Sequence, residues 1–467
     1  MNPLAQPDRD TFRLIIVRRN GSEILLRSSE SRWTLPCVQA SRQERLALQL
    51  TAELNRKLAL RAYCLFIPSI ADLGKDVGRR NYAVMESFSQ NDSAPSGTCW
   101  VPRAASACRR THPIEDADAV MQSLTALDSY VSDAKAGPFG RSGWLRELFA
   151  WTQEQLNPLG LRVNGNFRQL NGSPRFSLIR LETNGPAVWF KATGEPNLHE
   201  FPITLSLSQL FPANLPAILG VHHSWNGWLS EEASTSTLEQ FSDISIWEKV
   251  TKELAELQIA SIGKSGALLD AQCKDLRLQR LTNLISPFVA RMAEFMAVQE
   301  KQSPPALTIL ELDFLGESLR EAFSVLQNLR IPETLGHLDL NPGNILITAA
   351  RCVFLDWAEA CVTNPFVTFE YLAEHLRRSN ILGAEGRERA ATAYRRLWRS
   401  FLSPDDLTRA MDVSPLIAVF TYAVAANGWR SPDALQNVSD AGFLRALTRR
   451  MHREAVRLAE RSIGCSA

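Results

Sequence analysis

The sequence lacks several features that would assign it to a specialised class of protein. It contains no Cys-x-x-Cys pair, and its eight cysteines are dispersed over 467 residues. This pattern excludes a dense disulfide framework and predicts reduced thiols in a cytoplasmic protein. Neither sign of charge dominates, because 51 Lys and Arg residues are balanced by 50 Asp and Glu residues. No bulk field therefore favours nucleic acid or an anionic membrane as a partner.

Long hydrophobic runs are missing as well. The longest apolar stretch near the C-terminus, residues 415–426, is interrupted by Thr421 and is too short to span a bilayer. The first ten residues, MNPLAQPDRD, are polar and lack the apolar core of a signal peptide. We therefore expect a cytoplasmic protein with no membrane partner, whose length corresponds to roughly two to four domains.

The first part of the chain alternates between strand and helix signals. Residues 11–28 predict two strands around the turn Asn20-Gly21. A helix is expected over residues 43–60 and a strand over residues 63–67. Loop composition and a Gly-containing joint predict that this domain ends near residue 140, before an amphipathic helix at residues 144–156.

A short β-rich segment and a long helical one make up the rest of the chain. The runs FRQL, RFSLIRLE and AVWFKA predict a small antiparallel sheet within residues 167–192. Long helices are expected at residues 244–259, 276–300, 311–329, 369–377 and 387–401. One hairpin interrupts them, with residues 345–347 paired to residues 352–355.

The polar stretch LGHLDLNPGNILI precedes that hairpin. Phosphoryl transfer needs a carboxylate that orients a hydroxyl nucleophile, and oxygen ligands that hold Mg²⁺ on the nucleotide phosphates. His337, Asp339 and Asn344 follow the order H-x-D-x-x-x-x-N, which provides both from one turn. Asp356 in VFLDWAEA lies where a second metal carboxylate would be needed. Each residue alone would suit a capped turn, but the ordered combination favours a catalytic loop.

HLDLNPGNIL followed by FLDWAEA resembles the aminoglycoside phosphotransferase family of the protein-kinase-like fold. That family shows H-G-D-x-x-x-x-N-I-L and then a hydrophobic-D-W tripeptide. The resemblance implies that Asp339 is the catalytic base, that Asn344 and Asp356 bind Mg²⁺, and that His337 is a structural member of the catalytic loop. Leu338 replaces the usual Gly, a change in loop packing that bears on the substrate type.

The same resemblance predicts a lysine and its acidic partner upstream. Lys191 ends the strand AVWFKA, where the family has the Lys that holds the nucleotide phosphates. Glu200 is expected to pair with it, and Glu195 is the alternative. The competing interpretation is that all three are ordinary surface residues, since a Lys at a strand end and a Glu at a helix start are common there.

Two backbone segments complete the expected nucleotide site. The turn Asn171-Gly172-Ser173 is expected to cover the phosphates with its backbone amides. The stretch WLSEE, residues 228–232, which includes Leu229, fits the linker whose backbone binds adenine. The large lobe should supply the acceptor site, which in the resembled family often carries acidic side chains. Glu359, Glu370 and Glu374 follow the metal carboxylate, but we expect these three to be solvated or structural, so the sequence does not name the acceptor.

The N-terminal segment raises a second resemblance. The hairpin, RWTLP and a helix with Glu44, Glu53 and Leu54 resemble a Nudix domain, whose box reads G-x5-E-x7-R-E-U-x-E-E-x-G-U. Aligning Glu53-Leu54 with the E-U pair places Arg56 and Lys57 where the box has its paired Glu residues. Two cations would repel the metal that activates water, so we expect no hydrolase activity. Further departures are Val38, Ala52 and Ala59. The alternative is an unrelated α+β domain.

The sequence thus predicts an α+β protein in three parts. These are an α/β/α Nudix-like domain at residues 1–140, the small antiparallel-sheet lobe and hinge of a bilobal protein-kinase-like domain at residues 141–232, and its large helical lobe at residues 233–467. The resemblance implies Mg²⁺-dependent transfer of the γ-phosphoryl group of ATP or GTP to a hydroxyl of a small molecule. The alternative is a nucleotide-binding pseudokinase that acts as a sensor or scaffold. Protein kinase activity is disfavoured, because CVTNPF leads directly into a helix without a long activation segment.

Overall fold

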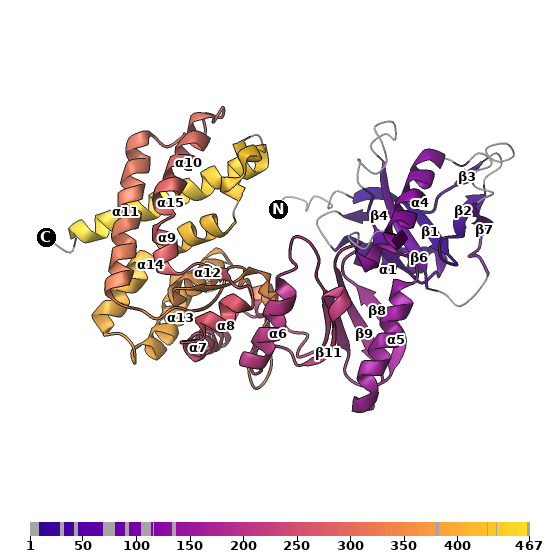
Figure 1. Ribbon diagram of the computed structural model, residues 1–467, viewed down its shortest axis with the longest axis horizontal. Coiled ribbons are helices and arrows are strands. Elements are labelled where there is room, and N and C mark those ends of the chain that lie inside the picture. The colour runs from indigo at the N-terminus through magenta and orange to yellow at the C-terminus, as the bar shows by residue number, and fades with distance from the viewer. Residues whose placement is uncertain are drawn as a thin grey trace. The chain divides into compact units, whose positions relative to one another are not determined.

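The computed structural model divides the chain into two compact units (Figure 1). The β-rich unit is Met1–Phe201 with Ala217–Glu232, and the helical unit is Pro202–Pro216 with Ala233–Ala467. Each has both strands and helices, as the predicted α+β class requires. The structure describes residues 9–28, 32–41, 45–68, 80–88, 93–103, 114, 116–132, 137–379, 383–426, 428–435 and 437–464. The cysteines among these described residues are free thiols, namely Cys37, Cys64, Cys99, Cys273, Cys352 and Cys361.

A seven-stranded mixed sheet forms the first half of the β-rich unit. Its order is β3-β2-β1-β6-β5, with β4 paired to β1 and β7 paired to β2. The strands are β1 Arg9–Arg18, β2 Glu23–Ser28, β3 Trp33–Thr34, β4 Cys37–Ser41, β5 Ala62–Phe66, β6 Asn81–Ser87 and β7 Thr98–Pro102. The hairpin predicted around Asn20-Gly21 is confirmed, since β1 and β2 pair antiparallel and both turn residues have positive φ.

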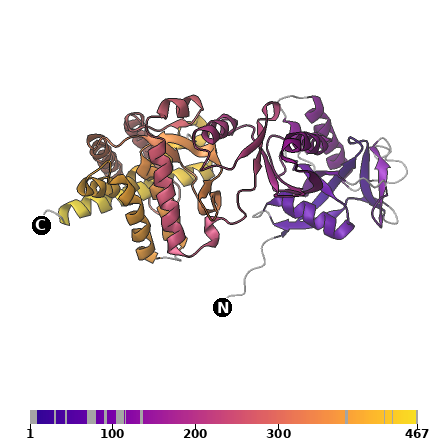
Figure 2. The ribbon, with the colours of Figure 1, turned by 90° about the horizontal axis from the view of Figure 1, so that it is seen from below.

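Helices cover both faces of this sheet, because the side chains of β1 alternate between two cores. Ile16 packs with α1 (Leu46–Leu58) on one face, and Ile15 packs with residues of α4 (Ala117–Ser132) on the other. Figure 2 shows the two helices on opposite sides of the sheet. The helix expected at residues 43–60 is thus present as α1, with shorter bounds.

A five-stranded antiparallel sheet, predicted from its alternating runs, forms the second half of the unit. Its order is β11-β12-β10-β9-β8. The strands are β8 Val163–Gln169, β9 Ser177–Thr183, β10 Val188–Ala192, β11 Ile218–His222 and β12 Gly227–Glu231. Helix α5 (Trp144–Leu156), which matches its predicted bounds, packs against β8 and β11 (Figure 1).

The two sheets of the β-rich unit share one hydrophobic core. The Trp144 ring lies 5.6 Å from Tyr63 of the first sheet and 5.0 Å from Phe139, whose ring in turn lies 6.3 Å from Phe190 of the second sheet. T-shaped contacts of this kind add to the burial of the rings. The N-terminal segment and the small sheet therefore bury apolar surface against each other.

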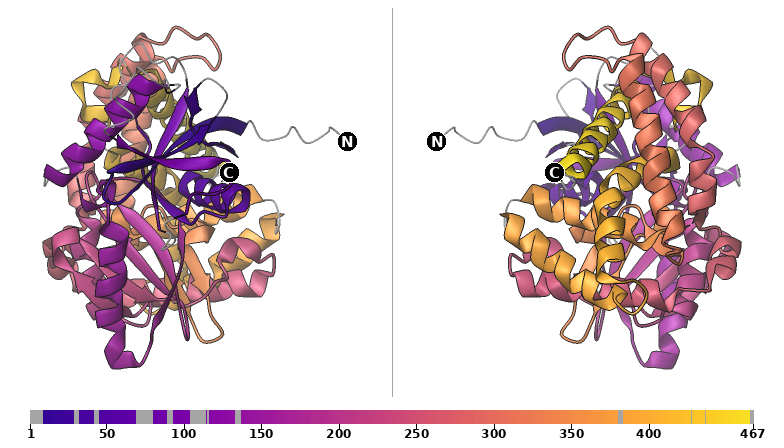
Figure 3. Two further views of the ribbon diagram at one scale, coloured as in Figure 1. Left: turned by 90° about the vertical axis from the view of Figure 1, so that its right-hand side faces the viewer. Right: turned by 90° about the vertical axis from the view of Figure 1, so that its left-hand side faces the viewer.

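Short strands and nine further helices build the described part of the helical unit. The helices are α7 Ile244–Ala260, α8 Ser265–Asp270, α9 Leu278–Thr282, α10 Ile285–Ala297, α11 Ile309–Asn328, α12 Pro365–Ser379, α13 Gly383–Trp398, α14 Pro404–Ala425 and α15 Val438–Gly464. Helix α6 (Glu200–Leu210) begins in the β-rich unit and continues here. Figure 3 shows α15, which packs against α10, α11 and α14.

The prediction of a single helix at residues 276–300 is wrong. The chain forms α9 and α10 instead, separated by a turn between Thr282 and Ile285. Pro287 lies in the first turn of α10, where its missing N–H leaves no intrahelical bond unmade. Apolar periodicity alone did not distinguish two consecutive helices from one.

Five short strands lie among these helices. The predicted hairpin is confirmed as β15 (Ile345–Ile347) paired with β16 (Cys352–Phe354). The sequence analysis missed a second sheet, in which β17 (Ala360–Thr363) lies between β13 (Lys274–Asp275) and β14 (Thr334–His337). Strands this short show no usable alternation in sequence.

Of the helices that the structure describes, one, α14, is long and apolar enough to cross a membrane by length and composition. Within its most apolar 18-residue window, 61% of the helix is buried. A buried core helix passes the same test.

One side chain, that of Gln169, links the two sheets of the β-rich unit and provides a test of their mutual support. Buried Gln169 accepts from the backbone N–H of Cys64 at 2.7 Å and donates to its carbonyl at 2.8 Å. We predict that Gln169→Ala lowers the free energy of unfolding by about 2–4 kcal/mol, because two buried backbone groups lose their partner. Urea unfolding measures the change. Gln39→Ala, at an exposed position of β4, should change it by less than about 0.5 kcal/mol, and equal effects of the two substitutions would contradict the prediction.

Candidate active site

Buried His337, the last residue of β14, holds the candidate catalytic loop through both ring nitrogens. Its Nε2 donates to the carbonyl of Leu355 at 2.9 Å, and its Nδ1 accepts from the backbone N–H of Asp339 at 3.1 Å. One donor and one acceptor describe the neutral imidazole. Burial lowers the pKa of His337, which favours that form. His337 therefore connects the segment before Asp339 to the strand that leads to Asp356.

A glycine fixes where this loop begins. Gly336 pairs with Cys361 in the ladder between β14 and β17. A Cβ at position 336 would lie 2.6 Å from Cγ2 of Thr363 and 3.0 Å from Oγ1 of Thr368. No larger residue fits without displacing these neighbours, so β14 can approach β17 and α12 this closely only with glycine.

The loop brings the predicted base and the first predicted metal ligand together. The Asn344 side-chain amide donates to the backbone carbonyl of Asp339 at 3.0 Å. The Asp339 carboxylate accepts from the hydroxyl of Tyr371, on α12, at 3.0 Å. Asn341 closes the turn between them, since its side-chain oxygen accepts from the N–H of Gly343 at 3.0 Å. The carboxylate is thus oriented by a helix that follows it by about thirty residues.

Asp356 occupies a strained position at the end of β16. Its backbone is left-handed, with φ 62° and ψ 59°. For a residue other than glycine this conformation costs about 1–2 kcal/mol. The indole N–H of Trp357 donates to the carbonyl of Phe354 at 3.1 Å and helps to hold this turn. The exposed carboxylate is thereby carried on a well-defined backbone.

Asn344 directly precedes β15 and Asp356 follows β16, the two strands of one hairpin. The backbone N–H of Leu355 donates to the carbonyl of Asn344 at 2.8 Å, which fixes their relative position. Both side chains offer oxygen atoms, the ligands that Mg²⁺ prefers, and phosphate oxygens and water usually complete its shell. Among the described residues there is no cluster of three or more His, Cys, Asp or Glu side chains that could hold a metal ion alone. The donor set therefore fits a metal that arrives with its nucleotide.

In the β-rich unit the structure brings Lys191 and Glu200 together. Lys191 on β10 forms an ion pair with Glu200, the first residue of α6, and its ammonium group lies 5.9 Å from the centre of the Trp228 ring. The Glu200 side chain is only 3% exposed. Glu195, the alternative partner, is exposed in the preceding loop. A buried carboxylate needs such a cation, because an unpaired charge in the interior is strongly destabilising.

The predicted phosphate-covering turn connects β8 and β9. The Asn171 side chain accepts from the N–H of Leu178 at 2.6 Å, and the Ser173 hydroxyl accepts from the N–H of Arg175 at 3.3 Å. Gly172 lies against the N-terminal sheet, where a Cβ would be 2.5 Å from the sulfur of Cys64. Whether its amides cover phosphate stays a prediction.

The prediction that residues 228–232 form the linker between the lobes needs correction. Most of it belongs to β12, where Leu229 is buried and pairs with Phe190 of β10 and Gly220 of β11. The chain leaves the sheet only after Glu231, and the division between the units falls after Glu232. The reason is that the apolar residues of this stretch complete the core of the sheet. The role predicted for Leu229 in adenine binding stays a prediction.

Basic side chains engage the three acidic residues that follow Asp356. Glu359 pairs with Lys274, Glu370 with Arg387 at 3.0 Å, and Glu374 with Arg377, Arg378 and Arg450 at 2.6, 2.7 and 3.1 Å. The sequence analysis missed the arginines and Tyr371. The runs HLRRS and YRRLWR were a signal for the former. No sequence signal pointed to the contact between Tyr371 and Asp339.

In the N-terminal segment, α1 carries the central residues aligned with the Nudix box, from Ala52 to Lys57. Exposed Arg56 pairs with Glu53 at 2.7 Å. Ala59, where the box has its last Gly, adopts the left-handed conformation that favours glycine, with φ 50°. Glu44 lies outside the described residues.

Comparison with known proteins finds a match for the segment that carries this site. Residues 266–409, which contain the whole loop, match the sequence model of the "Phosphotransferase enzyme family". The predicted resemblance is confirmed over this segment. The match does not reach the N-terminal segment, where the Nudix-like resemblance stays a prediction. No curated protein matches the chain in sequence.

Solved structures with low similarity include three small-molecule kinases. An ethanolamine kinase of Plasmodium vivax is 17% identical with a TM-score of 0.44, over 65% of this chain and 88% of its own. A macrolide 2′-phosphotransferase of Brachybacterium faecium is 14% identical with a TM-score of 0.43, over 65% and 98%. A choline kinase of Cryptosporidium parvum is 13% identical with a TM-score of 0.46, over 72% and 97%.

Glu370 makes the stability of the helical unit depend on pH. Burial raises the pKa of its carboxyl from an ordinary 4.5 to about 7, although Arg387 opposes the shift. The folded state therefore holds this proton more tightly than the unfolded state. The resulting stability is fully present below the unfolded value and is lost as the pH rises through the folded one.

We predict that ionisation of Glu370 lowers the free energy of unfolding by about 3 kcal/mol as the pH rises from 4.5 to 8. The substitution Glu370→Gln should remove this decrease. Urea unfolding at several pH values measures it. The lowered pKa of His337 makes the free energy of unfolding rise with pH instead, but it does so equally in wild type and in both variants. Glu388→Gln, whose side chain is 69% exposed, should keep the wild-type profile. Parallel profiles for wild type and Glu370→Gln would contradict the assignment.

Proposed function

We propose that this protein transfers the γ-phosphoryl group of ATP or GTP to a hydroxyl of a small molecule. The observation that carries the proposal is the loop in which one buried imidazole connects Asp339 to the hairpin of Asn344 and Asp356. It lies in the segment that matches the phosphotransferase family. The balanced charge and the absence of a long activation segment favour a cytoplasmic enzyme with a small acceptor over a protein kinase.

In the proposed mechanism, Asp339 orients the acceptor hydroxyl and accepts its proton as the oxygen attacks the γ-phosphorus. The bond to the β,γ-bridging oxygen breaks, and the products are a phosphate ester and the nucleoside diphosphate. Tyr371 and Asn344 hold Asp339 in place through its carboxylate and its carbonyl. Asn344 and Asp356 would hold Mg²⁺, which neutralises charge on the phosphate oxygens when bound. Geometry and charge stabilisation account for most of the catalysis in such reactions.

In the β-rich unit, Lys191 holds the nucleotide phosphates in this proposal, and Glu200 keeps its ammonium group oriented. The N-terminal segment supports that sheet through the shared core. We assign it no hydrolase activity, since Arg56 holds the one Nudix-type carboxylate of α1 that the structure describes, Glu53, in an ion pair.

We predict that Asp339→Asn lowers kcat by at least about 100-fold, the range typical of a lost general base, while the Kd for Mg·ATP stays within about threefold of wild type. Asp356→Ala should remove the Mg²⁺-dependent part of nucleotide binding as well. ADP release with a pool of sugars, amino sugars and amino alcohols measures turnover, and calorimetry measures binding.

Asp313→Asn, at an exposed position of α11, serves as the control and should behave as wild type. Full activity of Asp339→Asn would contradict the assignment of the base. A wild type that binds Mg·ATP through Asp356 without any turnover would favour the alternative function, a nucleotide sensor or scaffold.

The pair in the β-rich unit yields a separate prediction. Lys191→Met leaves buried Glu200 without its cation and should lower the free energy of unfolding by about 3–5 kcal/mol. The double variant with Glu200→Gln should recover most of that stability, yet keep a KM for ATP at least about tenfold above wild type. Urea unfolding and initial rates measure the two effects.

Lys252→Met, with a side chain that is 59% exposed, controls for loss of a lysine. A double variant with a wild-type KM would show that Lys191 supports the fold only.

A further inference from the structure

A cavity of about 560 Å³ in the helical unit lies beside the proposed base. Leu338, which precedes Asp339 and replaces the usual Gly of the family, lines it, and so does Tyr371, whose hydroxyl donates to the Asp339 carboxylate at 3.0 Å. His375 and Tyr422, whose rings lie 5.1 and 5.9 Å from that of Tyr371, also line the cavity. A molecule in the cavity would therefore lie next to the group that activates a hydroxyl.

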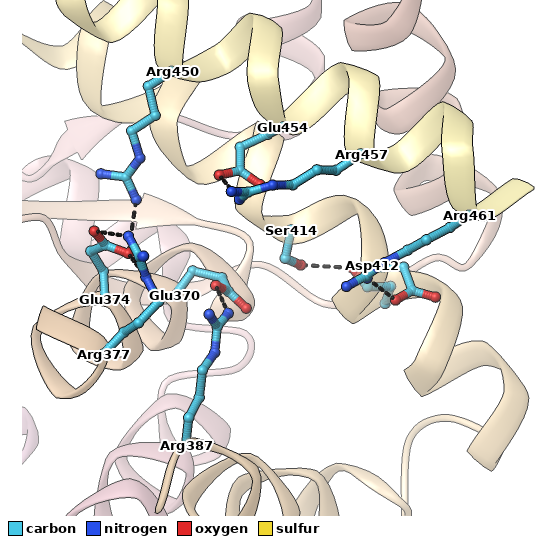
Figure 4. Close-up of polar contacts among 11 residues, drawn as sticks. Glu370, Glu374, Arg377, Arg387, Asp412, Ser414, Arg450, Glu454, Arg457 and Arg461 are labelled. Atoms are coloured by element: carbon cyan, nitrogen blue, oxygen red, sulfur yellow. Dashed lines mark hydrogen bonds and ion pairs between the residues drawn. The ribbon is translucent and has the colours of Figure 1, made fainter. Parts of the chain in front are cut away.

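Helix α12 extends this wall from the base to a group of arginines. Tyr371, Glu374, His375 and Arg378 are spaced i, i+3, i+4 and i+7, so they lie on one face of the helix, and all four line the cavity. Figure 4 shows arginines from α12, α13 and α15 directed toward the same space.

The charge of the lining is opposite to that expected for a cationic acceptor. Seven arginines and five acidic residues line the cavity. Every one of these acids has an arginine partner: the pairs are Glu370 with Arg387, Glu374 with Arg377, Arg378 and Arg450, Glu388 with Arg395, Asp412 with Arg461, and Glu454 with Arg457. An amine would therefore meet a guanidinium beside each carboxylate that it approached.

Three guanidiniums crowd around one carboxylate. Arg450 reaches across from α15, with a side chain only 27% exposed, and a single terminal nitrogen contacts Glu374 at 3.1 Å. A guanidinium has five N–H donors, so this contact leaves donors that an oxyanion can use. Burial and the nearby cations Arg378 and Arg377 lower the pKa of Arg450, although Glu374 opposes the shift. Another negative charge here would be favourable.

We propose that this cavity is the acceptor site and that the acceptor carries an oxyanion, either a phosphate or a carboxylate, in addition to the hydroxyl that is phosphorylated. Arg450 and Arg378 bind the oxyanion, and Asp339 receives the hydroxyl. The inference rests on the proposed phosphotransferase function, and it specifies the substrate class of that same site.

The first experiment measures anion binding without nucleotide. Inorganic phosphate, compared with chloride at equal ionic strength, should raise the melting temperature of the full-length protein. The rise should fall by at least half in Arg450→Gln and in Arg378→Gln, whose side chain is 62% exposed and whose loss leaves the fold intact. Arg399→Gln, at an exposed position outside the cavity, should keep the full rise. A rise that survives in both cavity variants, or no rise in the wild type, overturns the proposal.

The second experiment compares acceptors that differ in charge. With Mg·ATP, ADP release should be stimulated by glucose 6-phosphate or gluconate more than by glucose or glucosamine, and the first two compounds separate a phosphate from a carboxylate. Arg450→Gln should raise the KM for the anionic acceptor by about tenfold or more with kcat within about threefold. Stimulation by glucosamine alone, unchanged in Arg450→Gln, overturns the anionic class but leaves the phosphotransferase standing. Phosphate protection without any Mg·ATP binding overturns the proposed function instead.

Discussion

The geometry of the candidate active site depends on one buried imidazole. His337 accepts a hydrogen bond from the backbone of Asp339 and donates one to the carbonyl before Asp356, so a single ring positions both sides of the site. Each bond contributes only about 1 kcal/mol net, but losing either would leave a buried polar group unpaired, which costs more. Gly336 permits this arrangement, since any side chain there would collide with β17 and α12. Asp339 is thereby half-buried and Asp356 exposed, while the imidazole that orients both segments stays buried.

Helix α12 connects the proposed base, Asp339, to the neighbouring cavity. Tyr371 bonds to Asp339 from one turn, and Glu374 and Arg378 face the cavity from the next turns. Because these side chains share a rigid face, the distance from the base to the arginines is set by helical geometry rather than by loop conformation. Leu338 adds an apolar surface where the resembled family has a glycine. The departure from the family motif and the arginines of α12 therefore lie along the same cavity.

In the β-rich unit, the two sheets depend on each other for burial of their apolar side chains. Its two sheets bury Tyr63, Phe139, Trp144 and Phe190 in one cluster, and Gln169 joins their backbones. The sheet that carries Lys191 thus obtains part of its burial from the N-terminal segment. Arg56, at a position aligned with the Nudix box, pairs with Glu53. Support of the small sheet is the role of this segment that the shared core shows.

The sequence by itself determined the features that act over short distances along the chain. Alternation over residues 177–183 predicted a strand, and the spacing of His337, Asp339 and Asn344 predicted one polar loop, because neighbouring residues share backbone geometry whatever the rest of the fold does. The tertiary structure alone decided the rest. Strand β17 is too short to show a sequence pattern. Tyr371 meets Asp339 only because α12 packs beside the loop. Arg450 reaches Glu374 only because the fold places α15 next to α12. In sequence these arginines look like solvated helix residues, since the charge of a cavity depends on which distant helix faces enclose it.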